Sequence, residues 1–124
     1  MRKVALIACV KEKRNFPCKA IELYQSSLFF NWLKAAENQG VDTFYILSGK
    51  HGLLHPEEIV APYEYNLDLA SEEELENWSQ RVIQKLSLFE DLERSNFYIF
   101  SNDIYAKPLF SKLKSVVHFT YKSA

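Results

Sequence analysis

The feature that most constrains this chain is an uninterrupted apolar run near its N-terminus, the sequence VALIACV at residues 4–10. A strand with one solvated face alternates apolar and polar side chains, whereas an unbroken run indicates a strand covered on both faces. Such a strand lies inside a sheet that has helices packed above and below it. The run therefore predicts an α/β domain built around this segment.

Three further segments have the composition of strands. Residues 43–47, 96–100 and 116–121 are rich in aromatic and β-branched side chains. Because helical patterns alternate with these strands, we expect right-handed crossovers and a mainly parallel sheet. The predicted fold is a three-layer, Rossmann-like domain with helices on both faces of a four-stranded sheet, in the strand order 2-1-3-4.

The helices are predicted from their caps and apolar stripes. One begins after Ser26 or Ser27 and ends at Gly40. A second begins at Ser71, which forms a capping box with Glu74, and its apolar stripe continues to residue 86. A short helix is predicted from about residue 103 to residue 114, with a proline that either starts or kinks it. Residues 49–69 lack a period and are predicted to be irregular, and an irregular stretch of this length is more often functional than filler.

Length and composition predict one domain spanning residues 1–124, with 48% hydrophobic content. The sequence shows no secretion signal and no apolar run long enough for a membrane span. Its two cysteines, Cys9 and Cys18, have neither a disulfide framework nor a metal-ligand spacing. We therefore expect a cytoplasmic protein with reduced thiols and no membrane partner, and the sequence leaves the oligomeric state open.

Charge is distributed unevenly along the chain although the net charge is only −1. Residues 1–50 carry eight Lys or Arg against four Asp or Glu, residues 51–100 carry three against eleven, and residues 101–124 carry four against one. The basic ends predict one face suited to anions, while the overall charge does not favour nucleic acid.

Ligands in open parallel sheets bind outside the carboxyl ends of the strands. This rule selects the segments that follow the first three predicted strands, residues 9–14, 48–51 and 101–103. In the first of them, Lys11 and Lys13 can hold a phosphate, and a solvated basic loop is the alternative interpretation. Cys9 is a candidate nucleophile because nearby cations stabilise a thiolate, and simple packing at the end of the strand is its alternative.

The second segment places Ser48, Gly49, Lys50 and His51 in succession. Its glycine allows a sharp turn or a close approach to a ligand, and its cation and imidazole can hold an anion or move a proton. The alternative is a tight turn that needs glycine for its backbone alone.

The third segment offers Asp103 as a helix cap, a general base, or a ligand for a base edge or ribose hydroxyl. Tyr63 and Tyr105 add aromatic surface on which a planar base can stack, and core packing is the alternative. His55 and His118 are interpreted as structural or solvated side chains, so no metal site and no cofactor are predicted.

Four segments, at residues 9–13, 23–29, 48–53 and 62–63, resemble an uncharacterised family of small bacterial and phage α/β proteins. That family shows Cys-Ser with a following Lys, then Ser-Ala-Lys-His-Gly-Leu, Pro-Tyr and a late Tyr. Here Val10 and Gly49 stand in place of the Ser and the Ala, and Tyr105 matches the late Tyr. The resemblance spans most of the chain.

The second loop is also similar to the peroxide-stress protein family YaaA, in which a strand leads into Ser-Gly-x-x-Gly-x-x-x-Pro and then Pro-Tyr. The matching residues are Ser48, Gly49, Gly52, Pro56, Pro62 and Tyr63. That larger family is associated with DNA binding and with protection from oxidative damage. More distantly, a strand ending in Cys with a following Lys resembles domains of tRNA-base modification enzymes such as archaeosine synthase. Both resemblances imply a nucleobase or nucleic acid, and neither implies a particular reaction.

Together these patterns predict an enzyme-like domain that acts on or binds a nucleobase, a nucleotide, or DNA or RNA, in base modification or in a DNA-damage or stress response. The predicted catalytic residues are Cys9, His51 and Asp103. The predicted ligand- and phosphate-binding residues are Lys11, Lys13, Ser48, Gly49, Lys50, Tyr63 and Tyr105. The alternative hypothesis is a non-catalytic module that binds nucleic acid or a partner protein.

Overall fold

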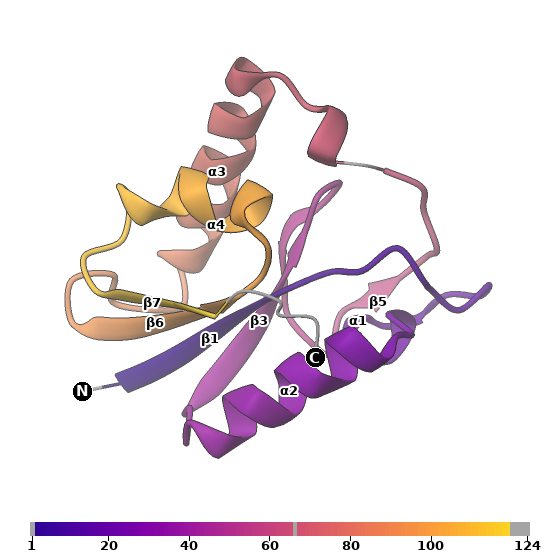
Figure 1. The fold of residues 1–124 in the computed structure, drawn as a ribbon, viewed down its shortest axis with the longest axis horizontal. Coiled ribbons are helices and arrows are strands. Elements are labelled where there is room, and N and C mark those ends of the chain that lie inside the picture. The colour runs from indigo at the N-terminus through magenta and orange to yellow at the C-terminus, as the bar shows by residue number, and fades with distance from the viewer. Residues whose placement is uncertain (1, 66, 120–124) are drawn as a thin grey trace.

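The computed structural model describes residues 2–65 and 67–119. A five-stranded sheet in the order β4-β3-β1-β6-β7 runs through the middle of the domain (Figure 1). Four of its strands are parallel, and β4 pairs antiparallel with β3 at one edge. In sheet order, the strands are β4 (Gly52–Leu54), β3 (Thr43–Ser48), β1 (Arg2–Ala8), β6 (Ser95–Phe100) and β7 (Val116–Phe119).

The mixed α/β fold and the mostly parallel sheet are confirmed, and the four predicted strands follow one another as β3-β1-β6-β7. The predicted count of four strands is too low, because β4 lies in the stretch that was predicted to be irregular. Gly52 has a φ of 77°, which lets the chain reverse after β3 and pair Gly52 with Ser48. The predicted fourth strand extended to residue 121, and Thr120 and Tyr121 lie outside the described residues.

Strand β1 is the centre of the sheet because both of its faces and both of its edges are covered. It pairs with β3 on one side and with β6 on the other. Val4 and Leu6 pack into one core, while Ala5 and Ile7 pack into the core on the opposite face. Each fully buried Val, Leu or Ile side chain contributes about 1.5–3 kcal/mol, so the apolar run fixes this strand in place.

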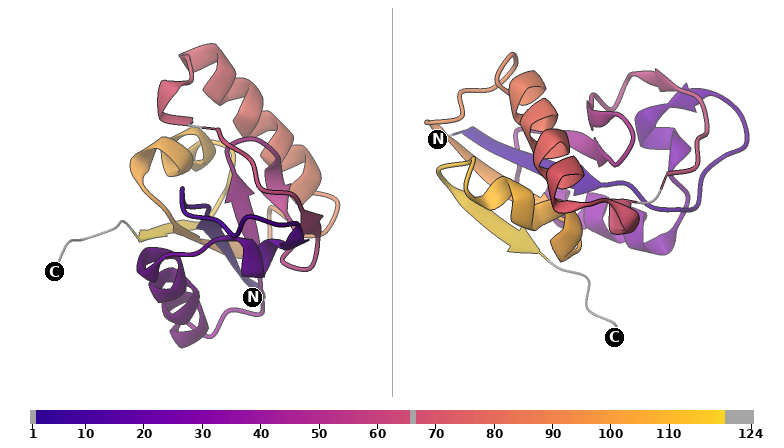
Figure 2. Two further views of the ribbon diagram at one scale, coloured as in Figure 1. Left: turned by 90° about the vertical axis from the view of Figure 1, so that its right-hand side faces the viewer. Right: turned by 90° about the horizontal axis from the view of Figure 1, so that it is seen from above.

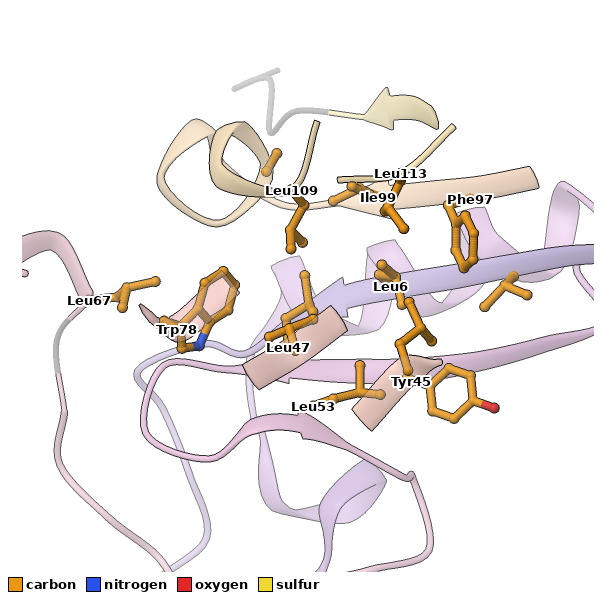
Figure 3. Packing of buried hydrophobic residues seen from close by; sticks show 14 residues of the cluster. Leu6, Tyr45, Leu47, Leu53, Leu67, Trp78, Phe97, Ile99, Leu109 and Leu113 are labelled. Atoms are coloured by element: carbon orange, nitrogen blue, oxygen red, sulfur yellow. The ribbon is translucent and has the colours of Figure 1, made fainter. Parts of the chain in front are cut away.

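Helices pack on both faces of the sheet (Figure 1, Figure 2). The helix α2 (Ser27–Asn38) lies on one face, and α3 (Glu72–Leu86) lies with α4 (Asp103–Phe110) on the other. Figure 3 shows the core beneath α3 and α4, where Trp78 packs beside Leu47 of the sheet. None of the helices in residues 2–65 and 67–119 combines the length and the apolar character needed to cross a membrane.

The helix ends follow the predicted caps. The Ser26 hydroxyl accepts a hydrogen bond from the backbone of α2, and Gly40 takes a φ of 68° just after the helix ends. The capping box of Ser71 and Glu74 is present at the start of α3. In α4, Pro108 lies inside the helix rather than at its start.

A small second sheet joins two loops that are far apart in the sequence. It pairs β2 (Cys18–Lys19) antiparallel with β5 (Ile59–Val60), and the short helix α1 (Ala20–Leu23) follows β2. A 3₁₀ turn, η1 (Leu67–Leu69), comes before α3. The sequence analysis did not predict these short elements. The pairing of β2 with β5 holds the loop after β1 beside the segment that leads to Tyr63.

We expect Ser71→Ala to lower the free energy of unfolding by about 1 kcal/mol, because it removes one side of a capping box on the longest helix. Urea denaturation of this variant and of wild type measures the change. The control is Ser111→Ala at the exposed C-terminal end of α4. An equal loss in both variants would contradict a role for the capping box.

Candidate ligand-binding cavity

A cavity of about 1040 Å³, here called the edge cavity, opens where β1 and β6 end. The chain reaches it from the loop after β1, from the segment after β5 and from the beginnings of α2 and α4. Its wall includes Cys9, Lys11, Lys13, Tyr63, Tyr65 and Tyr105. The position agrees with the rule that ligands of parallel sheets bind beyond the carboxyl ends of the strands.

At the cavity wall, the thiol of Cys9 meets a phenol. The Cys9 Sγ and the Tyr105 hydroxyl are 3.2 Å apart, within hydrogen-bonding distance. A Cβ atom added to Gly49 would lie 3.3 Å from the Tyr105 hydroxyl and 3.1 Å from a ring carbon of Tyr65. Glycine at this position therefore leaves room for both tyrosines against the turn after β3.

Tyr63 connects three parts of the chain through its hydroxyl. This group lies 2.6 Å from the Tyr24 hydroxyl and 2.7 Å from the Ser48 Oγ. Ser48 is fully buried, and its Oγ also accepts a hydrogen bond from the backbone N–H of His51. On the other side of the turn, the indole N–H of Trp78 donates to the Ser48 carbonyl. The turn after β3 is therefore fixed to the core and to Tyr63.

Two lysine ammonium groups lie over the ring of Tyr63. The Lys13 Nζ lies 4.5 Å from the ring centroid and the Lys50 Nζ lies 5.8 Å from it. Both distances are within the range of cation–π attraction, which is worth about 0.5–1 kcal/mol at exposed sites. The ligand-binding role predicted for Tyr63 stays a prediction, and the structure shows that its ring lies beside two ammonium groups.

Burial sets the protonation of the groups around the cavity. It raises the pKa of Tyr24, Tyr63 and Tyr105 well above the ordinary value, so these phenols are neutral at pH 7. Burial also lowers the pKa of Lys13, an effect that the nearby Cys9, Glu12 and Glu64 oppose. The cavity therefore contains neutral hydroxyl donors next to a partly desolvated ammonium group.

His51 lies at the rim, outside the cavity wall. Its ring meets the Tyr63 ring edge-on at a centroid distance of 5.0 Å. Burial is the main cause that lowers the pKa of His51, and the positive charge of Lys50 lowers it further. A neutral imidazole at pH 7 can accept a proton, which is the role predicted from the sequence.

The structure brings together most of the predicted site. The cavity wall holds Cys9, Lys11, Lys13, Tyr63 and Tyr105. The turn of residues 48–51 stands behind this wall and contacts it through Tyr63 and Tyr105.

Asp103 lies apart from this cluster. It is the first residue of α4, after the N-cap Asn102, and its carboxylate is 3.8 Å from the Lys107 ammonium. It lines a separate groove together with Glu72 and Leu75. The structure therefore places Asp103 beside α3 and outside the wall of the edge cavity.

Several wall residues had no assigned role in the sequence analysis. The cavity is also lined by Trp32, Glu64 and Asp68, and Tyr24 supports it from behind through Tyr63. Tyr24 and Tyr63 are separated by 39 residues, so no local pattern predicts their contact. No three His, Cys, Asp or Glu side chains in the described part of the chain are grouped so that they could hold a metal ion.

The structure is a mixed α/β fold with a cavity, lined by polar and aromatic side chains, where the parallel strands of its sheet end. The family of unknown function DUF6884 matches residues 4–121, so the chain belongs to this family. Comparisons with curated proteins and with solved structures gave no match.

We expect Tyr63→Phe to lower the free energy of unfolding by about 1–2 kcal/mol, because it leaves the buried Ser48 and Tyr24 hydroxyls without their shared partner. Urea denaturation measures the change. Tyr65→Phe is the matched control, because Tyr65 is 46% exposed. If both variants have the stability of wild type, the hydroxyl network does not hold the turn in place.

We expect Lys50→Gln to raise the pKa of His51 while leaving it below its ordinary value. The substitution removes a positive charge that disfavours the imidazolium, and the larger effect of burial remains. An NMR titration of the imidazole protons measures the pKa, with Lys34→Gln on α2 as the control for loss of charge. A His51 pKa that is the same in wild type and in Lys50→Gln would show that the two side chains do not interact.

Proposed function

We propose that the edge cavity binds a nucleobase or nucleotide, free or within DNA or RNA, and that this enzyme-like domain acts on it. The observation that carries the proposal is the combination of lysines and tyrosines in one large cavity at the carboxyl ends of the parallel strands. Small-molecule sites usually have volumes of about 300–1,000 Å³, so this cavity is large enough for a nucleotide.

The two kinds of side chain match the two parts of such a ligand. Lys11 and Lys13 supply positive charge for a phosphate. Tyr65 and Tyr105 supply aromatic surface for a planar base, and base–aromatic stacking is worth about 1–3 kcal/mol per base. Ser26 and Ser27 bring the N-terminus of α2 to the same wall, which also favours an anion.

Cys9 is the proposed nucleophile, and Tyr105 is its partner. The Tyr105 hydroxyl lies within hydrogen-bonding distance of the Cys9 Sγ and is neutral at pH 7, so it can donate a hydrogen bond to a Cys9 thiolate. His51 at the rim is the proposed proton acceptor for a ligand that extends beyond the wall. Asp103 has no part in this proposal, because its carboxylate faces Lys107.

Three broader interpretations accompany the proposal. The sheet with helices on both faces is interpreted as a Rossmann-like three-layer arrangement. The described cysteines, Cys9 and Cys18, are both free thiols, which agrees with the proposed cytoplasmic location. The resemblance to the YaaA family supports a role connected with nucleic acid or with stress.

We expect wild-type protein to be stabilised in a thermal-shift screen by at least one class among nucleobases, nucleosides, nucleotides and short oligonucleotides, because ligands that bind the native state raise the melting temperature. Lys13→Gln should reduce the shift given by phosphate-bearing ligands, and Tyr105→Leu should reduce the shift given by all of them. Lys34→Gln, which loses the same charge on α2, should behave as wild type.

Stabilisation by none of these compounds would contradict the proposal and favour a protein-interaction module. Binding that falls steeply with salt and is unaffected by Tyr105→Leu would indicate contacts to a nucleic-acid backbone without a base pocket.

A further inference from the structure

We propose that the ligand of this site carries two phosphoryl groups in succession, one held by Lys13 inside the edge cavity and the next held by Lys50 at its rim. The inference rests on the proposed nucleotide-type ligand and specifies its chemical class. The two ammonium groups over the single ring of Tyr63 carry the argument.

Half of the lysines in the described part of the chain form ion pairs with carboxylates, and the two beside Tyr63 are not among them. In residues 2–65 and 67–119, neither Lys13 nor Lys50 forms an ion pair with a carboxylate. The lysines that do are Lys19, Lys85, Lys107, Lys112 and Lys114. The charges near Tyr63 are therefore available to an anion, whereas the paired lysines are already compensated.

A buried hydrogen-bond network holds the ring of Tyr63, and both ammonium groups lie over this ring. The Tyr63 hydroxyl forms hydrogen bonds with the hydroxyls of Tyr24 and Ser48, and these bonds restrict the orientation of the Tyr63 ring. The Lys13 ammonium also donates to the Lys11 carbonyl, which holds it near the cavity. Both ammonium groups lie within 5.8 Å of one ring centroid, so their like charges repel, and a pair of anionic groups relieves that repulsion.

The two lysines stand at different places relative to the cavity. Lys13 belongs to the cavity wall, together with Glu12 and Glu64. These two carboxylates raise the pKa of Lys13 without forming an ion pair with it. Lys50 is exposed and lies outside the wall, in the turn after β3. One phosphate bound beside Lys13 leaves Lys50 uncompensated, whereas a second phosphate on the same ligand passes over Tyr63 and reaches it.

Two sources provide this chemistry. A nucleoside diphosphate has both phosphoryl groups at one end of the molecule, and a nucleic-acid strand has a phosphate on each side of a nucleotide. In both sources Lys13 holds one phosphate and Lys50 holds the next. The experiment therefore includes one ligand of each kind.

The test is isothermal titration of wild type, Lys50→Gln and the charge control Lys34→Gln. The ligands are inorganic phosphate and pyrophosphate, the 5′-mono- and 5′-diphosphates of adenosine, guanosine, cytidine and uridine, and a 5′-phosphorylated dinucleotide of each base. We expect the diphosphate or the dinucleotide to bind wild type about tenfold or more tighter than the monophosphate, because hydrogen bonds to charged groups are among the strong ones. Lys50→Gln should abolish this advantage and change the affinity for the monophosphate less than twofold.

The outcomes separate this inference from the proposed function. Equal affinities for mono- and diphosphorylated ligands, or an equal loss for both in Lys50→Gln, would overturn the inference while nucleotide binding stands. Pyrophosphate binding that needs Lys50, with nucleotides no tighter than pyrophosphate, supports the two-phosphate site and contradicts the base pocket. An advantage confined to the dinucleotide identifies a nucleic-acid strand as the source, and one confined to the diphosphate identifies a free nucleotide.

Discussion

The burial of β1 on both faces is the constraint on which the other features of this domain depend. The strand carries apolar side chains alternately into two cores and pairs with β3 and β6 along its two edges. Because all three strands are parallel, the chain leaves them at the same edge of the sheet. The loop after β1 and the start of α4 therefore contribute polar side chains to one cavity, and the turn after β3 supports its wall from behind through Tyr63.

Tyr63 holds these loops in a defined arrangement. Its segment has little regular structure of its own, and the small sheet of β2 and β5 holds it beside the loop after β1. Its hydroxyl forms hydrogen bonds with the buried hydroxyls of Ser48 and Tyr24. The ammonium groups of Lys13 and Lys50 lie over its ring. A buried hydroxyl that lost these partners would be costly, so the network orients the ring and, through it, the two cations. The placement of the two ammonium groups thus depends on the hydrogen bonds of the Tyr63 hydroxyl.

The sequence was sufficient for features that have a local signal. The unbroken run of β1, the capping box at Ser71 and the glycine at residue 40 each predicted the observed element. The edge strand β4 was missed because three residues are too few to show a period. The parallel rule selected Cys9 and Lys13, which line the cavity, and it also selected Asp103, which lines a separate groove beside α3. The contact of Tyr63 with Tyr24 has no local signal at all.

The most direct test of the account is to map where a nucleotide binds, by following backbone amide NMR signals during titration with the nucleotide that stabilises the protein most. The account predicts that the largest shifts occur at residues 9–13, 63–65 and 102–105, with smaller shifts at residues 48–51. Shifts concentrated at the groove between α3 and α4, or spread evenly over the surface, would contradict the assignment of the edge cavity as the binding site.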